Sequence, residues 1–232
     1  MKLIINILII LAIISCNHKE GVEINWKDYN VEGKVKMLSE RTIYAKCNAD
    51  INVNLDTSLN NLTFIQNRYF NRKGLLTKIN YFDKDSLMTL KIVYLISRGK
   101  IIGTNEFKEG KKKEKMEIKK LNENTYKSIT YDFETADTIS TSYTHRKGGY
   151  IYKQSFESKF SGRIHKTVKY FYRNESGLIT EIIDTTKIDN QQFTTNTFVK
   201  YLELDSSNNW TKKVEYSNDS ICRITTRKLE YY

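Results

Sequence analysis

Few residues of this 232-residue chain have the types and spacing that catalysis or metal binding requires. Its three histidines are isolated: His18 lies near the start, His145 precedes a Gly-Gly turn, and His165 lies within an expected strand. A zinc site usually takes clustered His or Cys ligands at short spacing, and the sequence lacks the Gly-x-Ser-x-Gly elbow of a serine hydrolase. A Ser-His-Asp set is recognised by its geometry, so that chemistry stays open. We predict that His145 and His165 are surface residues of strands, with no metal and no cofactor.

The 27 acidic residues are scattered along the chain rather than paired. Glu181 and Asp184, for example, lie at an odd spacing within one expected strand and would face opposite sides of a sheet. A glycoside hydrolase needs two carboxylates roughly 5–10 Å apart across a cleft, a separation that one sequence cannot establish. The carboxylates are therefore expected on solvated faces, and we predict that the protein is not an enzyme.

Cys16 is the residue with the most specific predicted chemistry. It follows one basic residue, Lys2, and a largely apolar run from Leu3 to Ile14. That run is too short to span a bilayer comfortably and is typical of the core of a secretory signal peptide. The sequence Ile13-Ile14-Ser15-Cys16 resembles a bacterial lipobox, in which the cysteine receives diacylglycerol and becomes the first residue. We predict a signal peptide over residues 1–15 and a lipid anchor at Cys16; an ordinary signal peptide and a core helix ending in cysteine are the alternatives.

The residues after Cys16 bear on the location. Asn17-His18-Lys19-Glu20 resembles the surface-export signal of Bacteroidota lipoproteins, which usually has two acidic residues where this chain has only Glu20. The sequence therefore predicts a lipid-anchored protein of the outer membrane and leaves open whether it faces the periplasm or the cell surface. Residues 16–30 are expected to form the lipidated tether, with Trp26 and Tyr29 docked on the edge of the following domain.

The composition indicates one large domain with a basic surface. Loss of residues 1–15 would leave 217 residues and, because Lys2 is removed, would lower the formal charge from +11 to +10. Hydrophobic residues make up 39% of the chain, which is enough for a core, and the absence of proline suits uninterrupted strands. The positive charge favours anionic partners such as lipid headgroups or an acidic glycan, although a soluble surface is the simpler interpretation. Nucleic acid is not expected as a partner outside the cytoplasm.

A short cassette recurs three times and organises the chain. Its copies are Gly74–Tyr81, Gly177–Ile183 and Asn208–Tyr216. Each begins with Gly or Asn, residues that tolerate the left-handed backbone of a tight turn. A threonine lies three residues after the turn residue and is followed by a charged residue. The repeat predicts a β-meander built from turn-and-strand units.

The predicted fold is all-β: a large, twisted antiparallel β-meander over residues 31–232, either an open curved sheet or a partly closed barrel. No stretch after residue 20 shows sustained helical periodicity, and alternating segments are separated by turns of Gly, Asn, Asp and Ser. The loop from Asp50 to Asn61 is the only plausible internal boundary. The expected strands are 33–47, 62–71, 75–82, 87–96, 100–108, 113–121, 125–133, 138–146, 150–160, 163–173, 178–187, 193–204, 210–216 and 221–232.

The series of aromatic, turn, Gly, hydrophobic, Thr and Lys or Glu residues resembles the YD/RHS-type repeats and the wedge-like repeat lipoproteins of Bacteroidota, most specifically at the two ends of the chain. The most specific part is Asn208–Lys213 with Ile224–Arg227 and Glu230–Tyr232, and Gly33–Lys36 looks like the start of such proteins. The Tyr-Asp dipeptide itself occurs once, at Tyr131-Asp132, and the repeats are too few for a closed RHS cocoon. The resemblance implies a β-repeat fold and an envelope location rather than an activity.

Two further kinds of covalent modification are hypotheses from the sequence. Cys47 and Cys222 could pair in an oxidising compartment and close a long loop between the first and last strands; two buried thiols are the alternative. Four tripeptides resemble the Bacteroidota O-glycosylation motif, although Asp-Ser is also common in turns. The hydroxyl residues of those tripeptides are Ser86, Thr138, Thr185 and Ser220.

These features favour a lipid-anchored envelope protein whose β-meander acts as a structural or binding module. Its expected partners are the membrane, through diacylglycerol on Cys16, and an envelope protein or an anionic glycan. A half-barrel carrier of a lipid or another apolar ligand is the second hypothesis. An envelope hydrolase is the third, and it would require polar side chains that converge in a cleft.

Overall fold

The computed structural model describes residues 21–47, 53–54, 63–160, 162–217 and 221–232. These residues form fifteen strands and one 3-10 helix, η1 (Trp26–Tyr29). The strands are β1 (Val35–Cys47), β2 (Val53–Asn54), β3 (Phe64–Phe70), β4 (Leu76–Phe82), β5 (Met88–Ser97), β6 (Lys100–Lys108), β7 (Lys111–Asn122), β8 (Thr125–Asp132), β9 (Thr138–Lys147), β10 (Tyr150–Phe160), β11 (Arg163–Arg173), β12 (Ile179–Ile188), β13 (Gln191–Leu204), β14 (Trp210–Tyr216) and β15 (Ile221–Tyr231).

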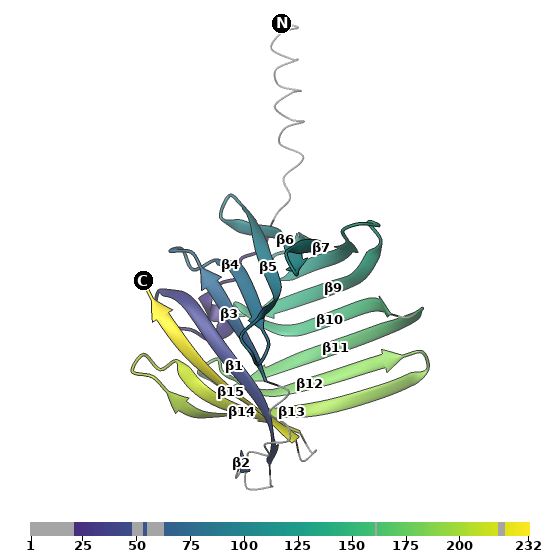
Figure 1. Ribbon diagram of the computed structural model, residues 1–232. Coiled ribbons are helices and arrows are strands. Elements are labelled where there is room, and N and C mark those ends of the chain that lie inside the picture. Colours follow the sequence, from purple (N-terminus) through teal and green to yellow (C-terminus); the bar gives the residue numbers. More distant parts are fainter. Residues whose placement is uncertain (1–20, 48–52, 55–62, 161, 218–220) are drawn as a thin grey trace, which may run out of the picture.

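Fourteen of the described strands close into an antiparallel barrel (Figure 1). Strands β3 to β15 pair with their neighbours in chain order, and β1 pairs with β3 on one side and with β15 on the other. The closing pair runs from Val35 opposite Tyr231 to Lys46 opposite Ile221. The two-residue β2 pairs with the end of β1. The predicted all-β antiparallel meander is confirmed, and its ends meet.

The recurring cassette forms the same turn in all three copies. In the first copy the side chain of Asn71 accepts the backbone N–H groups of Lys73 and Leu75 at 3.0 and 3.1 Å, and Gly74 adopts a φ of +83°. This left-handed backbone strains residues with a Cβ, and Gly and Asn tolerate it best. The other copies repeat the side-chain acceptor and the positive φ with the pairs Asn174/Gly177 and Asp205/Asn208.

All three turns lie at one end of the barrel. Successive turns of a meander alternate between its two ends, and these turns follow β3, β11 and β13, which run in the same direction. The start of β1 and the end of β15 lie at this end too, since Val35 pairs with Tyr231. We call it the plugged mouth, because the N-terminal segment crosses the barrel there.

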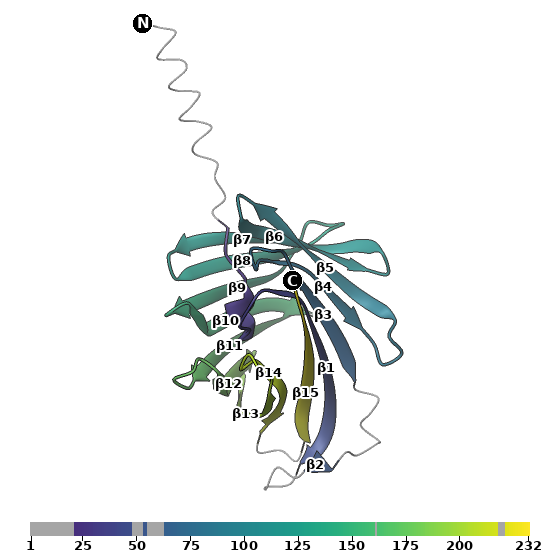
Figure 2. The same cartoon turned by 90° about the vertical axis from the view of Figure 1, so that its left-hand side faces the viewer.

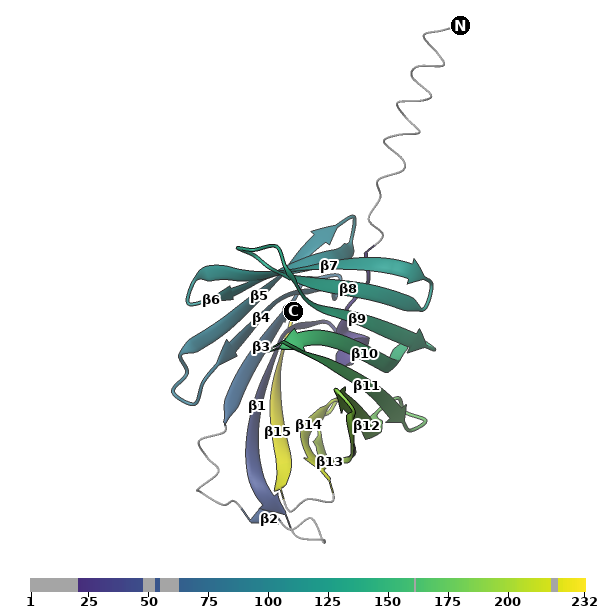
Figure 3. The ribbon, with the colours of Figure 1, turned by 90° about the vertical axis from the view of Figure 1, so that its right-hand side faces the viewer.

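Residues 21–34, the plug segment, cross the lumen at the plugged mouth, where Figures 2 and 3 show the purple turn of η1 among the strands. Val22 forms an antiparallel bridge with Ile101 of β6, and Asn25 forms one with Leu75 before β4. A capping box holds η1: the Asn25 side chain accepts the Lys27 N–H at 3.0 Å, and Asp28 accepts the Asn25 N–H at 2.9 Å. The tether expected over residues 16–30 therefore has its described part, residues 21–30, inside the barrel.

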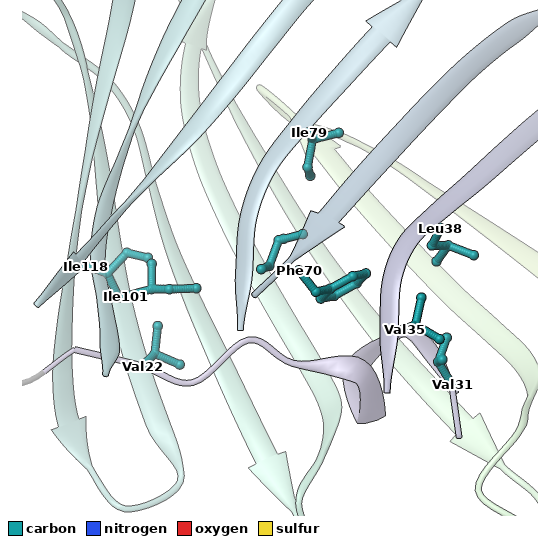
Figure 4. Packing of buried hydrophobic residues seen from close by; sticks show 9 residues of the cluster. Val22, Val31, Val35, Leu38, Phe70, Ile79, Ile101 and Ile118 are labelled. Carbon is teal, nitrogen blue, oxygen red and sulfur yellow. The ribbon is translucent and has the colours of Figure 1, made fainter. Parts of the chain in front are cut away.

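The main hydrophobic core joins the plug segment to the inner wall. Val22 and Val31 of the segment are 6% and 3% exposed, so this polar-looking stretch contributes two side chains to the core. Figure 4 shows Val22 beside Ile101 and Ile118. The buried cluster comprises Val22, Val31, Val35, Leu38, Phe70, Leu76, Ile79, Ile101 and Ile118.

Gly74→Ala is expected to lower the free energy of unfolding by about 2–3 kcal/mol. Its φ is +83°, and a Cβ there would lie 2.8 Å from the ring of Trp26, so the plug segment would have to move. Gly110 is a matched control, because its φ is +76° and a Cβ there meets nothing within 4 Å. Gly110→Ala should lower the free energy of unfolding by about 1 kcal/mol, because only the strain of the positive φ acts there. Urea unfolding checks both, and equal losses would mean that the Trp26 contact contributes nothing.

Candidate functional site

Four inward-facing arginines from well-separated strands converge on the plug segment. Each supplies a planar fork of N–H donors that can hold several acceptors at once. We call them the arginine clamp: Arg68 of β3, Arg146 of β9, Arg173 of β11 and Arg227 of β15.

Three members of the arginine clamp contact side chains of η1 or the residue after it. Arg146 forms an ion pair with Asp28 at 2.6 Å, in which the Asp28 side chain is 4% exposed. Arg173 donates to the side chain of Asn30 at 3.1 Å. The Arg68 guanidinium lies 4.7 Å from the centre of the Tyr29 ring. These contacts hold the plug segment to β3 on one side and to β9 and β11 on the other.

Arg227 is the most deeply buried member of the clamp, at 4% exposure. It donates to the backbone carbonyls of Tyr29 at 2.9 Å, Asn30 at 2.8 Å, and Trp210. Its guanidinium also lies 3.8 Å from the centre of the Trp210 ring. Burial lowers the pKa of Arg227 to about 10 against the raising effect of Glu40, so the side chain stays charged at neutral pH.

Two buried carboxylates, Glu40 and Glu215, lie in the lumen near the arginine clamp, and each pairs with cationic side chains. Glu40 of β1 accepts from Arg68 and, at 2.9 Å, from Gln66 of β3. Burial would raise the pKa of Glu40, but the Arg68 charge and hydrogen bond outweigh it and hold that pKa below its ordinary value.

Glu215 of β14, the second carboxylate, is 6% exposed and bridges two cations. Lys213 lies 2.9 Å from one of its carboxylate oxygens and Arg223 lies 2.5 Å from the other. Burial again acts to raise the pKa of Glu215, and the two cations together lower it. Both carboxylates are therefore ionised at neutral pH.

These groups line a cavity of about 220 Å³, the lumenal chamber, beneath the plug segment. Its walls include Glu40, Arg68, Trp210, Lys213, Glu215 and Arg223. A second cavity of about 330 Å³ shares Glu215 and Arg223 with it and adds Lys169 and Asp184, which pair at 2.8 Å. The lumen thus holds two adjoining polar spaces on the side of β1 and β11–β15.

Hydroxyl groups continue the polar lining around the inner wall. Cross-strand pairs of inward-facing hydroxyls form hydrogen bonds of 2.8–3.0 Å. Short hydroxyl side chains leave space in the lumen and present both donors and acceptors to it. The pairs are Thr42–Thr225, Ser128–Ser142 and Thr167–Thr186.

The lumenal chamber contains fixed charges and hydrogen-bonding groups. Glu40 and Glu215 have lowered pKa values, so neither of these two is a proton donor at neutral pH. Burial raises the pKa of Tyr29 and of Tyr201 to about 12, so both phenols stay neutral. Among the residues that the structure describes, no group of three or more His, Cys, Asp or Glu side chains could hold a metal ion. The chamber can offer fixed charges and hydrogen bonds to a bound molecule.

The histidines and the hydroxyls predicted from sequence lie away from the lumenal chamber. His145 is half-buried on β9, where its ring centre lies 6.2 Å from that of Tyr152, and His165 is half-buried on β11. Ser86 and Thr138 are exposed at hairpin turns, as glycosylation would require, and Thr185 is half-buried opposite Thr194. Cys16 and Ser220 lie outside the described residues.

Cys222 is disulfide-bonded in the structure. It lies directly opposite Ala45 in the closing pair of strands, and Cys47 follows Ala45 by two positions in β1. This register is compatible with the Cys47–Cys222 bond, which stays a prediction for peptide mapping without reduction. Such a bond would fasten the seam where the barrel closes.

The arginine clamp was missed by the prediction from sequence. Nine arginines are spread among 38 basic residues, and composition alone does not distinguish the four that matter. A usable signal lies in Arg146 and Arg173, which each occupy an inward position just before a turn at the plugged mouth. Arginine there, where lysine would suffice for solubility, is typical of a buried multidentate contact.

Comparisons with known proteins find similar structures but no similar sequence. The sequence matches no family model and no curated protein. A porin-like protein from Bacteroides vulgatus is similar in structure, with a TM-score of 0.49 and 9% identity over 87% of this chain and 99% of that one. Another from Bacteroides uniformis has a TM-score of 0.46 and 12% identity over 90% and 99%. Within the described residues no helix is long and apolar enough to cross a membrane.

Proposed function

We propose that this protein is a lipid-anchored, non-enzymatic binding module of the cell envelope whose barrel holds a small polar solute. The observation that carries the proposal is the lumenal chamber, where paired charges and hydrogen-bonding groups face a cavity. The envelope location and the anchor at Cys16 come from the sequence. Binding is favoured over the hydrolase hypothesis because Glu40 and Glu215 are held ionised by cations and so are not proton donors at neutral pH.

The outer face of the barrel supports a module that stands beside the bilayer instead of within it. Lys166 of β11 and Glu157 of β10 lie opposite each other on this face, with side chains 59% and 54% exposed. Lys127 and Lys153 also point outward, from the third residue of β8 and the fourth residue of β10, over Tyr143 and Tyr170. A lysine on the lipid face of a membrane barrel costs roughly 2–4 kcal/mol near the midplane. Attachment through Cys16 avoids that cost.

The polar lining favours a polar ligand over the apolar ligand of the carrier hypothesis. Both lumenal cavities are lined by ion pairs, and burying an apolar chain against them would exclude water from charged groups without giving them new hydrogen bonds. A small solute with its own charges or hydroxyl groups would replace that water. The volumes of about 220 and 330 Å³ suit a molecule of metabolite size.

Fluorine NMR of protein labelled with 5-fluorotryptophan tests this function. The chain has two tryptophans, and Trp26→Phe assigns their resonances. Because Trp210 lines the lumenal chamber, its resonance is expected to shift and saturate with at least one of three probes: glycine betaine, succinate or glucose. Arg223→Gln should weaken that binding at least tenfold, whereas Arg41→Gln, on the outer face, should not.

Two outcomes of this titration would overturn the proposal. One is a Trp210 resonance that none of the three polar probes moves. The other is a shift that only the apolar probe N-phenyl-1-naphthylamine produces, which would establish the apolar carrier in its place.

A further inference from the structure

The plugged mouth is the end of the barrel that the lipid anchor would hold close to the bilayer. The described chain begins at Gly21, where a Cβ would lie 2.4 Å from the carbonyl oxygen of Ile101, so the segment enters the barrel directly beside β6. Cys16 lies five residues before Gly21. A fully extended chain covers at most ~3.6 Å per residue, so the anchor allows a gap of roughly 18 Å. The inference below rests on that proposed anchor.

A basic pocket of about 320 Å³ opens at this point of the plugged mouth. Its lining includes Lys27 of η1, Lys100 of β6, Lys120 of β7 and Arg146, together with Glu23 and Glu123. Arg146 is engaged by Asp28 at 2.6 Å. Lys27 and Lys100 are exposed. The pocket therefore gathers three lysines from three elements around a polar space.

The hairpin turns beside this pocket present basic and apolar side chains together. The β5–β6 turn carries Arg98, exposed with a φ of +49°, and follows Ile96, whose side chain is 38% exposed. Leu121, at the end of β7, is 48% exposed. Exposed apolar residues next to basic ones are the usual composition of a surface that contacts the membrane interface.

We propose that this surface, the plug rim, lies against the bilayer and that its pocket takes the phosphate of a lipid headgroup. The plug rim comprises the pocket lysines Lys27, Lys100 and Lys120 with the flanking Ile96, Arg98 and Leu121. Electrostatic attraction is screened over ~8–10 Å at physiological salt. The gap of roughly 18 Å that a fully extended tether allows is about twice this screening length. The lysines therefore come within range of anionic headgroups whenever the tether is less than fully extended. The apolar tips then enter the interface while the opposite mouth faces away.

Lysine acetylation of the lipidated protein on vesicles tests the plug rim. The protein is placed on vesicles of phosphatidylcholine alone or of phosphatidylcholine with one quarter phosphatidylglycerol, and mass spectrometry follows each lysine. Lys100 and Lys120 are expected to react at least threefold more slowly on the anionic vesicles. Lys111 and Lys159, near turns of the opposite mouth, should react equally on both.

Charge variants distinguish binding of lipid in the pocket from attraction of the whole protein to the vesicle by its net charge. In the double variant Lys27→Gln and Lys100→Gln, the protection of Lys120 on anionic vesicles should disappear. The matched variant Lys111→Gln and Lys159→Gln, which removes the same charge from the opposite mouth, should retain it. Equal loss in both variants would overturn the proposal, because net charge alone would then explain the protection.

Three further outcomes are distinguishable. Equal reaction rates on both vesicles, with the diacyl adduct present by intact mass, would overturn the plug rim and leave the anchored binding module standing. Absence of the adduct from membrane-fraction protein would overturn the anchor and the plug rim together. If 10 mM inorganic phosphate protects Lys100 and Lys120 on neutral vesicles as well as anionic lipid does, the pocket is a site for free phosphate and the membrane contact is wrong.

Discussion

Arg227→Met is expected to lower the free energy of unfolding by about 3–5 kcal/mol, the largest effect of any single substitution considered. The guanidinium is 4% exposed, and it is the hydrogen-bond donor to three backbone carbonyls, of Tyr29, Asn30 and Trp210. Methionine fills a similar volume but donates nothing, so these carbonyls would be buried without that donor. Urea unfolding followed by far-UV circular dichroism gives the loss.

Two comparisons make the Arg227 result specific. Arg41→Met, on the exposed face of β1, should change stability by less than about 0.5 kcal/mol. Arg227→Lys keeps the charge but cannot satisfy three carbonyls in a fork, so about half of the loss should remain. Hydrogen exchange should show the amides of residues 21–31 opening first. A variant as stable as the parent would mean that the plug segment is held by its hydrophobic contacts alone.

Acid should weaken the fold through Glu40 and Glu215. Both carboxyls have a lowered pKa in the folded state, from an ordinary value of 4.5. The stability they contribute is therefore fully present above about pH 4.5 and is lost as the pH falls through the lower folded values. Urea midpoints measured from pH 7 to pH 3 should decline most steeply below pH 4.5.

Glu215→Gln should lower the free energy of unfolding at pH 7 by about 2–3 kcal/mol. This is less than the full cost of breaking a buried ion pair, because Arg223 is partly exposed and solvent screens its charge. It should also flatten the acid decline, since one of the two titrating groups is gone. Glu157→Gln, on the outer face, should alter neither quantity appreciably, because its side chain is 54% exposed. An unchanged acid slope in Glu215→Gln would show that the lumenal ion pairs do not set the pH dependence.

The strands and turns could be predicted from the sequence, because their causes are local. Alternation marks each strand, and an Asx side chain followed by Gly or Asn marks each cassette turn, as at Asn71 and Gly74. The closing of the sheet could not be predicted, since it depends on Val35 meeting Tyr231 from the other end of the chain. Alternation also could not show which face of each strand points into the lumen, because both faces of this barrel carry polar residues.

The sequence predicts a tether where the structure has the plug segment, and the difference has a physical reason. Its residues are mostly polar, and a polar stretch after a lipidated cysteine is usually solvated. What buries it is the set of contacts to Arg227 and Arg146, and Arg227 recognises backbone carbonyls that every sequence possesses. Contacts of this kind leave no trace in the identity of the residues that accept them. The lumenal chamber could not be predicted for a different reason: its groups come from strands distant along the chain.

The seam between β1 and β15 also dictates the order of events during synthesis. The first strand of the barrel cannot pair with its second partner until the eleven residues of β15, Ile221–Tyr231, have been made. Until then the growing meander has an unsatisfied edge at each end, and long-range pairing of this kind is slow and prone to aggregation. Arg227 belongs to the same strand, so its contacts to the plug segment form only after β15 has been made. A ribosome that stalls before residue 221 would release a curved ribbon, and proteases and chaperones would meet it as unfolded protein.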